Sequence, residues 1–348
     1  MKRVDVAVLG ATGAVGQRFV RLLECHPWFR LTEVVASDRR AGEPYADAVR
    51  WIDGPLPPDA RELPLRRGSD DLDAEVCFSA LPGGRAGPLE RSLAARGYPV
   101  FTNARDLRLE PEVPLVVPEI NSGHIALVDR QRGTGRHGFV VANGNCTAII
   151  LSLALKPLVD AFGVDRCSVV SFQAVSGAGY PGVPSLDIAD NVIPFIEGEE
   201  GKVEAEVPKI LGRIENDHVA PAGVTVSATC ARVPVLEGHT LAVGVRLQGR
   251  APLERVREAF ESFSAEPQRL RLPSAPAKPV LFRTEDDRPQ PRKDRELGGG
   301  MTVTVGRLRP DPLMDYKFIA VGSNTIRGAA GASILNAELA MARGLLDD

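Results

Sequence analysis

The stretch VDVAVLGATGAVGQ, residues 4–17, joins an apolar run to a glycine-rich loop. Val4–Leu9 is predicted to be a β-strand, and a helix is predicted over Gln17–Cys25. The loop between them contains Gly10, Gly13 and Gly16. Glycines at such a turn let the backbone approach a pyrophosphate, and a helix N-terminus attracts the anion. The stretch therefore predicts a nucleotide-binding βαβ unit, although the spacing is G-x-x-G-x-x-G and a tight turn without a ligand is the alternative.

The next hundred residues continue the α/β pattern. Three apolar runs have the continuous Val, Ile and Phe character of strands that are buried on both faces: Leu31–Ala36, Val76–Leu81 and Val100–Asn103. A helix is predicted over Leu89–Arg96, with Gly97 as the residue that ends it. The first ~140 residues are thus predicted to form a doubly wound, Rossmann-type domain, since a chain of this length favours about two domains.

The later part of the chain has a different strand pattern. Strands are predicted over Cys167–Val175, Val224–Arg232 and Leu241–Leu247, and the last of these alternates apolar and other residues. Alternation is typical of a sheet with one open face, so an α+β domain with an antiparallel or mixed sheet is expected. Further predicted elements are a polar loop over Gln131–Gly138, a helix over Pro252–Phe263, strands over Met301–Leu308 and Lys317–Val321, and a final helix over Thr325–Arg343.

Composition excludes several classes of protein. The chain has 348 residues, 44% of them hydrophobic and 25% charged, with a net charge of -3. We expect no nucleic-acid partner and no membrane partner, because the sequence lacks both a clustered basic face and an apolar run of ~18 residues. The five cysteines are odd in number and lack C-x-x-C spacing, so no disulfide framework and no metal site are predicted. A reducing cytoplasm fits this pattern.

The residues after the second predicted strand bear on cofactor choice. They read Ser37-Asp38-Arg39-Arg40-Ala41-Gly42. An acid at this position contacts a ribose 2′-hydroxyl, whereas an arginine accepts a 2′-phosphate. Ser37, Arg39 and Arg40 favour NADP, and Asp38 is compatible with NAD. A solvated charged turn is the third interpretation.

The stretch ANGNCTAIIL, residues 142–151, places a cysteine at a helix start. Asn143 or Asn145 is suited to cap a helix over Thr147–Lys156. A helix N-terminus favours the thiolate, so Cys146 is a candidate nucleophile; a buried structural cysteine is the alternative.

A nucleophilic cysteine also requires a base. His239 immediately precedes a predicted strand, and Arg232 ends the strand before it, so the two could supply a general base and an anion clamp. The other four histidines are expected at the surface: His26, His124, His137 and His218.

Nearly the whole chain resembles the aspartate-β-semialdehyde dehydrogenase family, particularly its archaeal and fungal-type branch. The resemblance rests on long motifs: GATGAVGQRF, SALP at 79–82, VPLVVPEIN at 113–121, NGNCTA, QAVSGAGYPGVPSLDIADNVIPFI at 173–196, RVPVLEGHT, DRPQPRKDRELGGGMTVTVGR and NTIRGAAGASILNAELA. It implies an NADP-binding domain over 1–143, completed by a C-terminal helix over 325–348, and a catalytic and dimerisation domain over 144–324. It also implies a homodimer or homotetramer.

The resemblance assigns roles to individual residues. Cys146 matches the nucleophile that forms a thioester, His239 the acid/base, and Gln173 the glutamine near the thioester carbonyl. Arg232 matches the residue that binds the substrate α-carboxylate, and Glu199 the one that faces the amino group. Two cations match the phosphate site, Lys202 and Arg108. The positions implied to bind the cofactor are Gly10, Thr12, Gly13, Ala14, Val15, Ser37, Arg39, Ser79, Leu81, Ser176, Gly177 and Asn324.

The implied reaction is the NADPH-dependent conversion of L-aspartyl-4-phosphate to L-aspartate 4-semialdehyde and phosphate, a step in the biosynthesis of lysine, methionine, threonine and isoleucine. The sequence departs from the family at Gly144, Arg105 and Arg40, where proline, serine and a small polar residue are usual. An acyl-CoA reductase similar to malonyl-CoA reductase, or a paralogue acting on a modified aspartate, is therefore a competing hypothesis. A non-catalytic nucleotide-binding scaffold is a third, which the presence of a nucleophile and a base disfavours.

Overall fold

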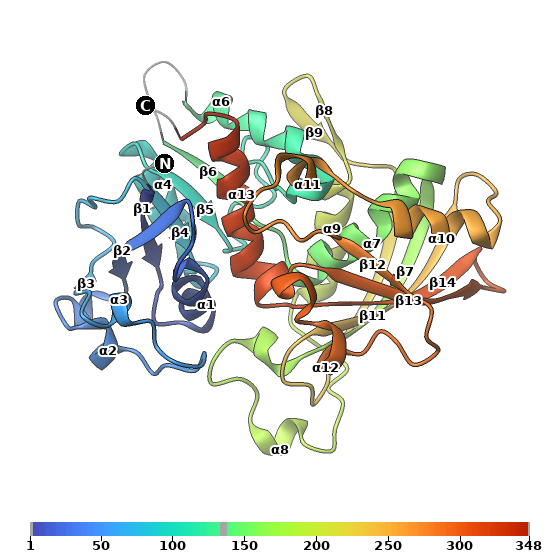
Figure 1. Ribbon diagram of the computed structural model, residues 1–348, viewed down its shortest axis with the longest axis horizontal. Coiled ribbons are helices and arrows are strands. Elements are labelled where there is room, and N and C mark those ends of the chain that lie inside the picture. The colour runs from blue at the N-terminus through green and yellow to red at the C-terminus, as the bar shows by residue number, and fades with distance from the viewer. Residues whose placement is uncertain (1–2, 133–137, 347–348) are drawn as a thin grey trace. The chain divides into compact units, whose positions relative to one another are not determined.

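The computed structural model describes residues 3–132 and 138–346. Most of the predicted loop over Gln131–Gly138 and the last two residues of the predicted C-terminal segment lie outside these ranges. The chain divides into two compact units (Figure 1). The first unit contains Met1–Val116, Gly123–Asn143 and Ala329–Asp348, and the second contains Val117–Ser122 and Gly144–Gly328. The division thus returns to the first unit after Gly328, and a short segment near residue 120 belongs to the second unit.

The first unit is built on a six-stranded sheet in the order β3-β2-β1-β4-β5-β6. Every neighbouring pair is parallel. This is the strand order of a doubly wound dinucleotide-binding fold, in which ligands bind beyond the carboxyl ends of the strands. The strands are β1 (Val4–Leu9), β2 (Phe29–Val35), β3 (Leu65–Arg66), β4 (Val76–Ser79), β5 (Pro99–Thr102) and β6 (Phe139–Ala142).

Helices of the first unit depart from the predicted bounds at their ends. The first helix begins at Ala14, three residues earlier than predicted, because Gly16 packs inside its first turn against the Gly10 carbonyl. It ends at Leu23, and Cys25 has a left-handed backbone (φ 59°). Gly97 (φ +103°) follows the fourth helix as predicted. The helices are α1 (Ala14–Leu23), α2 (Tyr45–Ala48), α3 (Pro58–Arg61), α4 (Ala86–Ala95), α6 (Val128–Arg132) and α13 (Gly331–Ala342).

The C-terminal helix α13 packs on the first sheet, although it lies almost two hundred residues after β6 (Figure 1). Its Glu338 carboxylate lies 2.9 Å from His26 Nε2, and both side chains are buried. Asn103 Nδ2, which follows β5, donates to the Ser333 hydroxyl at 3.3 Å. These polar contacts favour one position of the helix on the sheet, since the buried His26 and Glu338 would otherwise be desolvated without a partner.

The second unit contains a mixed six-stranded sheet in the order β10-β7-β11-β14-β13-β12. The pairs at its two ends, β10–β7 and β13–β12, are parallel, and the three pairs between them are antiparallel. This confirms the expected mixed sheet. The strands are β7 (Val164–Gln173), β10 (Thr225–Arg232), β11 (His239–Leu247), β12 (Val280–Arg283), β13 (Val303–Pro310) and β14 (Tyr316–Gly322), and a separate hairpin contains β8 (Arg213–Glu215) and β9 (His218–Ala220).

Helix α7 (Cys146–Phe162) packs on one face of this sheet. Of its first twelve residues, all except Cys146 and Lys156 are buried. It extends six residues beyond the predicted end, because Pro157 is accommodated within the buried helix. Alternate residues of β11 face the same side, and Leu241, Val243 and Val245 are fully buried as the alternation predicted. The other helices are α5 (Pro118–Asn121), α8 (Ser185–Ile188), α9 (Glu199–Ile210), α10 (Leu253–Ser262), α11 (Glu266–Leu270) and α12 (Pro291–Asp294).

Three strand ends of the second sheet meet at one edge. Gln173 at the end of β7 pairs with Arg232 at the end of the parallel strand β10. The antiparallel strand β11 begins at the same edge, where Thr240 pairs with Phe172. The register therefore brings residues from three distant parts of the sequence together.

Among the described residues, no helix is long and apolar enough to cross a membrane.

Candidate active site

Cys146 is the first residue of α7. The side-chain oxygen of Asn145 caps this helix by accepting hydrogen bonds from the amides of Thr147 at 2.9 Å and Ala148 at 3.1 Å. Of the two predicted capping residues, Asn145 therefore has this role, and Asn143 bonds instead to Asn103 and to the Ala329 carbonyl. Cys146 is partly exposed, whereas Cys77, Cys167 and Cys230 are buried. Its position at a helix N-terminus favours the thiolate.

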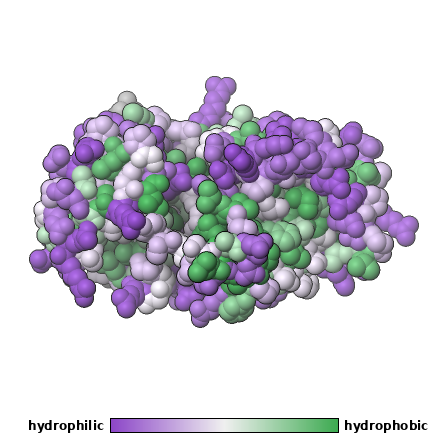
Figure 2. Space-filling model, turned by 90° about the horizontal axis from the view of Figure 1, so that it is seen from below, coloured by the Kyte–Doolittle hydropathy of each residue, from purple (hydrophilic) through white to green (hydrophobic). Residues whose placement is uncertain are grey.

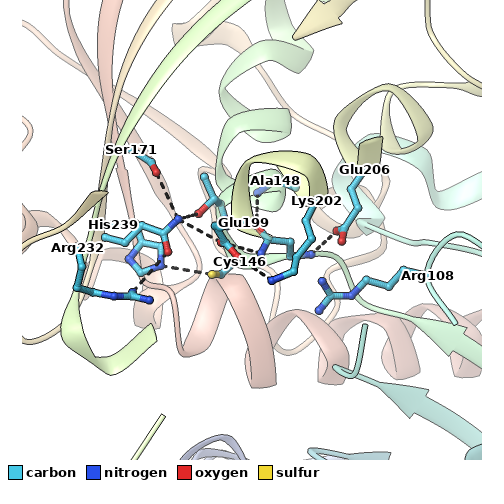
Figure 3. A network of polar contacts seen from close by, with 12 residues as sticks. Arg108, Cys146, Ala148, Ser171, Glu199, Lys202, Glu206, Arg232 and His239 are labelled. Atoms are coloured by element: carbon cyan, nitrogen blue, oxygen red, sulfur yellow. Dashed lines mark hydrogen bonds and ion pairs between the residues drawn. The ribbon is translucent and has the colours of Figure 1, made fainter. Parts of the chain in front are cut away.

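His239 Nε2 lies 3.3 Å from Cys146 Sγ (Figure 3). The ring is fully buried at the start of β11. Its other nitrogen, Nδ1, accepts a hydrogen bond from the Ala174 amide at 3.1 Å. Because Nδ1 is an acceptor, a neutral ring must hold its proton on Nε2, and that N–H donates to the sulfur.

Burial lowers the pKa of His239 to about 3, and the positive charge of Arg232 adds to this shift while Glu199 opposes it. The ring is therefore neutral at physiological pH. A neutral imidazole with its proton on Nε2 can stabilise the Cys146 thiolate as a hydrogen-bond donor.

Arg232 reaches the same site from the end of β10. Its Nη1 donates to the Ala174 carbonyl at 2.9 Å and lies 3.5 Å from Gln173 Oε1. Burial lowers the pKa of this guanidinium, and the negative charges of Cys146 and Glu199 oppose that shift. An arginine stays charged in proteins, so Arg232 provides a fixed cation.

Glu199, the first residue of α9, is held by three neighbours (Figure 3). Its Oε1 accepts from Asn145 Nδ2 at 2.8 Å and from Gln173 Nε2 at 3.1 Å, and its Oε2 pairs with Lys202 Nζ at 3.1 Å. Burial would raise the pKa of this carboxyl, but the Asn145 hydrogen bond and the Lys202 charge outweigh it and hold the pKa below its ordinary value. Glu199 is thus a buried carboxylate that remains charged.

Gln173 connects these groups. Its Nε2 also lies 2.9 Å from the Thr147 hydroxyl and 3.3 Å from that of Ser171. The amide therefore contacts α7, α9 and β10 at once, and it fixes the side chains of Glu199 and Arg232 relative to the cysteine-bearing helix.

The glycine loop of the first unit fits a dinucleotide. Gly10 has φ +73°, and a Cβ there would lie 2.8 Å from the Ala80 carbonyl oxygen. The N-cap of α1 is Gly13, which offers no side-chain cap, so the first-turn amides are available to a phosphate. The Tyr45 hydroxyl donates a buried hydrogen bond to the Ala11 carbonyl at 2.8 Å and so holds the loop in place. Thr12, Ala14 and Val15 of this turn are half-buried.

The two arginines after β2 differ in their contacts. Arg40 Nη1 donates to the Ala48 carbonyl. Arg39 is exposed, and within the described part of the chain it makes no hydrogen bond or ion pair. Arg39 and the exposed Ser37 are therefore the groups that could hold a 2′-phosphate.

Other predicted cofactor positions lie on both units. In the first unit, the Ser79 hydroxyl donates to Glu90 at 2.6 Å inside the core, so only its backbone is available to a ligand, and Leu81 is half-buried. In the second unit, Asn324 Nδ2 donates to the Ser176 hydroxyl at 2.9 Å. A Cβ on Gly177 would lie 2.6 Å from Arg232 Nη1.

Comparisons with known proteins agree with this geometry. Residues 5–128 match the family model described as semialdehyde dehydrogenase, NAD binding domain, and residues 155–327 match semialdehyde dehydrogenase, dimerisation domain. The aspartate-semialdehyde dehydrogenase of Methanothermobacter thermautotrophicus is 49% identical over 97% of this chain and 98% of its own length. The enzyme of the same name from Trichophyton rubrum is 45% identical over 97% of both chains.

The chain belongs to the aspartate-semialdehyde dehydrogenase family. A crystal structure of aspartate semialdehyde dehydrogenase with NADP from Candida albicans also matches, with a TM-score of 0.92, 38% identity, and coverage of 99% of this chain and 100% of that one. The fold class and the family resemblance expected from the sequence are confirmed.

Six predicted residues of the semialdehyde dehydrogenase site meet in the second unit: Cys146, Gln173, Glu199, Lys202, Arg232 and His239. The seventh, Arg108, belongs to the first unit, where its Nη2 donates to the Asn103 carbonyl at 2.7 Å. Asn145 was predicted only as a possible helix cap, and its bond to Glu199 was not predicted. Thr147 and Glu206 were not predicted as site residues, and Glu206 follows no recognisable motif.

The expectation that four histidines lie at the surface was wrong for His26 and His124, which are 7% and 4% exposed. His26 is buried because it pairs with Glu338 of α13 and accepts the amides of Trp28 and Phe29. His218 is exposed as expected, and His137 lies outside the described residues.

The low pKa of His239 predicts a specific pH dependence of stability. Between pH 6.5 and about 3, the unfolded chain binds a proton at this residue that the folded chain does not bind. The free energy of unfolding therefore falls as the pH falls through this window, by up to about 1.4 kcal/mol per pH unit. We expect His239→Gln to reduce the loss of Tm between pH 6.5 and 4.5, measured by differential scanning calorimetry. His218→Gln, at an exposed position, should keep the wild-type dependence, and parallel curves for wild type and His239→Gln would contradict the assignment.

Proposed function

We propose that this chain reduces L-aspartyl-4-phosphate to L-aspartate 4-semialdehyde and phosphate with NADPH, through a thioester on Cys146. The contact of 3.3 Å between Cys146 Sγ and His239 Nε2 carries the proposal, because it supplies a thiolate at a helix start and a donor beside it. The membership of the family and the near-complete length of the match support the same reaction.

Arg232 and Glu199 are the proposed ligands of the amino acid part of the substrate. Arg232 uses only Nη1 in contacts within the described residues, so its Nε and Nη2 edge is available for a bidentate bond to the α-carboxylate. Glu199 remains a carboxylate and would attract the α-ammonium group. An acyl-CoA that lacks an α-carboxylate and an α-ammonium group would leave the Arg232 guanidinium without a substrate anion and would use neither of these two charges, which favours an amino acid substrate.

The first chemical step is attack of the Cys146 thiolate on the β-carbonyl carbon. A C–S bond forms, the C–O bond to phosphate breaks, and phosphate leaves as an anion. We propose Lys202, and Arg108 of the first unit, as its cationic ligands. Lys202 already pairs with Glu199 and keeps a side chain that is 25% exposed, so it can also meet an incoming anion.

Once the sulfur is acylated, the His239 Nε2–H loses its thiolate acceptor. It can then donate to the oxygen on the reacting carbon, where negative charge develops. Bound NADPH supplies the hydride that reduces the thioester. Collapse of the resulting tetrahedral oxyanion breaks the C–S bond and returns the thiolate to its position beside His239. We propose that Gln173 acts by holding Glu199 and Arg232 in place, since the two N–H groups of its amide already have protein oxygens within hydrogen-bond distance.

The cofactor is NADP, with Arg39 as the proposed ligand of its 2′-phosphate and the Gly10–Val15 turn as the pyrophosphate site. Ser176, Gly177 and Asn324 of the second unit are the proposed contacts beyond this turn. We also place the reaction in the cytoplasm, since all five cysteines are free thiols.

We propose that the protein assembles as a homodimer through the second unit, which carries the match to the dimerisation domain. The segment around α8 exposes large apolar side chains, among them Leu186 (93% exposed) and Phe195 (66%). Figure 2 shows apolar residues gathered on the face of the molecule that is seen from below. Such a patch on a globular protein marks an interaction site. A dimer of dimers would use a further surface.

The proposed reaction is tested in its reverse direction. We expect NADPH formation from L-aspartate 4-semialdehyde to require phosphate, because phosphate is the group that releases the acyl chain from sulfur. Cys146→Ala should reduce kcat by at least about a thousandfold, as loss of a nucleophile does elsewhere. Cys25→Ala, at an exposed cysteine outside the site, is the matched control. Activity that ignores phosphate, activity that survives in Cys146→Ala, or faster NADPH consumption with malonyl-CoA than with aspartyl phosphate would refute the proposal.

The role of Arg39 is tested by cofactor preference. We expect Arg39→Ser to raise the KM for NADP at least tenfold, which corresponds to about 1.4 kcal/mol of lost binding. The KM for NAD should not change, because NAD lacks the 2′-phosphate. Arg40→Ser should have the smaller effect, since that guanidinium is bonded to the Ala48 carbonyl. An equal change for both cofactors in Arg39→Ser would contradict the assignment.

The homodimer is tested by sedimentation. We expect wild-type protein to sediment as a dimer, and the double variant Leu186→Ser with Phe195→Ser to shift toward the monomer, because two apolar anchors of the interface are lost. Leu313→Ser removes an 82% exposed leucine of the β13–β14 turn and should leave the mass unchanged. A wild-type monomer, or a double variant that stays fully dimeric, would contradict the proposed surface, and a wild-type mass of four chains would identify a tetramer.

A further inference from the structure

The residues between β14 and α13 contact both members of the Cys146–His239 pair. β14 ends at Gly322, which pairs with His239 in the antiparallel ladder. The chain then passes through Ser323–Gly328, which we call the 323–328 segment. A π-helical turn, Ile326–Ala330, begins within it. π-Helical turns are rare in proteins, and those that occur often lie at functional sites.

At one end, the segment abuts the cysteine. A Cβ on Gly328 would lie 2.5 Å from Cys146 Cβ and 2.9 Å from its Cα. The Gly328 amide donates to the Ser323 carbonyl at 2.9 Å, so a backbone hydrogen bond joins the two ends of the segment. The backbone of Gly328 therefore lies against Cys146, and any side chain at position 328 would displace the cysteine. Gly322 is also close to α7, since a Cβ there would lie 2.8 Å from Ile150 Cγ1.

The middle of the segment holds the turn that precedes His239. Asn324 Oδ1 accepts the amide of Gly238 at 2.9 Å, and Gly238 has a left-handed backbone (φ +95°). The Thr325 hydroxyl donates to the Glu237 carboxylate, and the Ser323 hydroxyl lies 3.4 Å from the same oxygen. Three consecutive side chains thus bind the two residues before the histidine.

A buried ion pair anchors the segment. Arg327 donates to Glu119 in bidentate geometry, with contacts of 2.6 and 2.8 Å, and both side chains are fully buried. Glu119 lies on α5, which also packs against α7. Removal of one partner would leave a buried charge unpaired, so the pair strongly favours a single position of the segment.

We propose that the 323–328 segment sets the distance between Cys146 Sγ and His239 Nε2. The inference rests on the proposed function, since it concerns the same nucleophile. Cys146 belongs to a helix and His239 to a strand, and neither element by itself fixes their separation to the precision that catalysis requires. Gly328 and Thr325 are positioning residues: they touch neither substrate nor sulfur in this role, and they act through Cys146 and His239.

The first test replaces Gly328 by alanine. The added methyl group displaces Cys146 from the His239 donor, and a displacement of this kind costs about 100-fold in kcat. We expect kcat to fall by that factor with the KM for NADP unchanged, and the pH midpoint of Cys146 alkylation by iodoacetamide to rise. Gly223→Ala is the matched control, because Gly223 is exposed, has nothing within 4 Å of its Cβ position and lacks a positive φ.

The second test is milder and keeps the proposal falsifiable if Gly328→Ala does not fold. Thr325→Val removes the hydroxyl that binds Glu237 and preserves the side-chain shape, whereas Thr325→Ser keeps the hydroxyl. We expect Thr325→Val to lower kcat at least tenfold and to raise the alkylation midpoint, and Thr325→Ser to restore both toward wild type.

Alkylation separates this inference from the proposed reaction, because it is followed by mass spectrometry at Cys146 without substrate. If the wild-type enzyme does not act on aspartate semialdehyde but both variants shift the midpoint, the proposed function fails and the positioning role stands. If folded Gly328→Ala and Thr325→Val keep the wild-type midpoint and a kcat within threefold of wild type, the positioning role is overturned.

Discussion

The hydrogen bond from the Ala174 amide to His239 Nδ1 determines the chemistry of the site. It leaves the proton of the neutral ring on Nε2, where it faces the sulfur of Cys146. If Nδ1 donated a hydrogen bond here instead of accepting one, the Nε2 of the neutral ring would become an acceptor toward Cys146 instead of a donor. The contact exists because β7 and β11 are antiparallel neighbours, so the residue after β7 lies beside the first residue of β11. The sheet register thus decides which nitrogen of the neutral His239 ring holds the proton.

Burial acts on the three ionisable neighbours of Cys146 in different ways. It keeps His239 neutral, whereas Glu199 stays charged because Asn145, Lys202 and Gln173 outweigh desolvation. The site therefore combines a fixed anion, a fixed cation at Arg232 and a neutral donor at His239. These three groups match an amino acid substrate, which has two charged groups and one reacting carbonyl.

The sequence was sufficient for the fold because local and long-range signals agree. Continuous apolar runs predicted the parallel sheet, and alternation at Leu241–Leu247 predicted the half-covered sheet, because these periods follow from which faces are buried. Element ends were less predictable: α1 starts early because Gly16 packs against Gly10, a tertiary contact with no local signature. For the site, the capping pattern and His239 could be found from the residues alone. The tautomer of His239 and the contacts of Glu206 and Gly328 depend on distant backbone atoms, which no local pattern encodes.

Gly144 illustrates the same limit. From the sequence, a glycine in place of proline predicts a looser turn before the nucleophile. In the structure, the next residue restricts that turn: the Asn145 amide donates to Glu206 at 2.5 Å, its Nδ2 to Glu199 at 2.8 Å, and its Oδ1 accepts two helix amides. A Cβ at position 144 would lie 3.1 Å from Ile149 Cγ1 and 3.3 Å from Ile210 Cδ1. The absence of a side chain therefore permits close packing of α7 against α9, and Asn145, rather than residue 144, fixes the direction of the thiol.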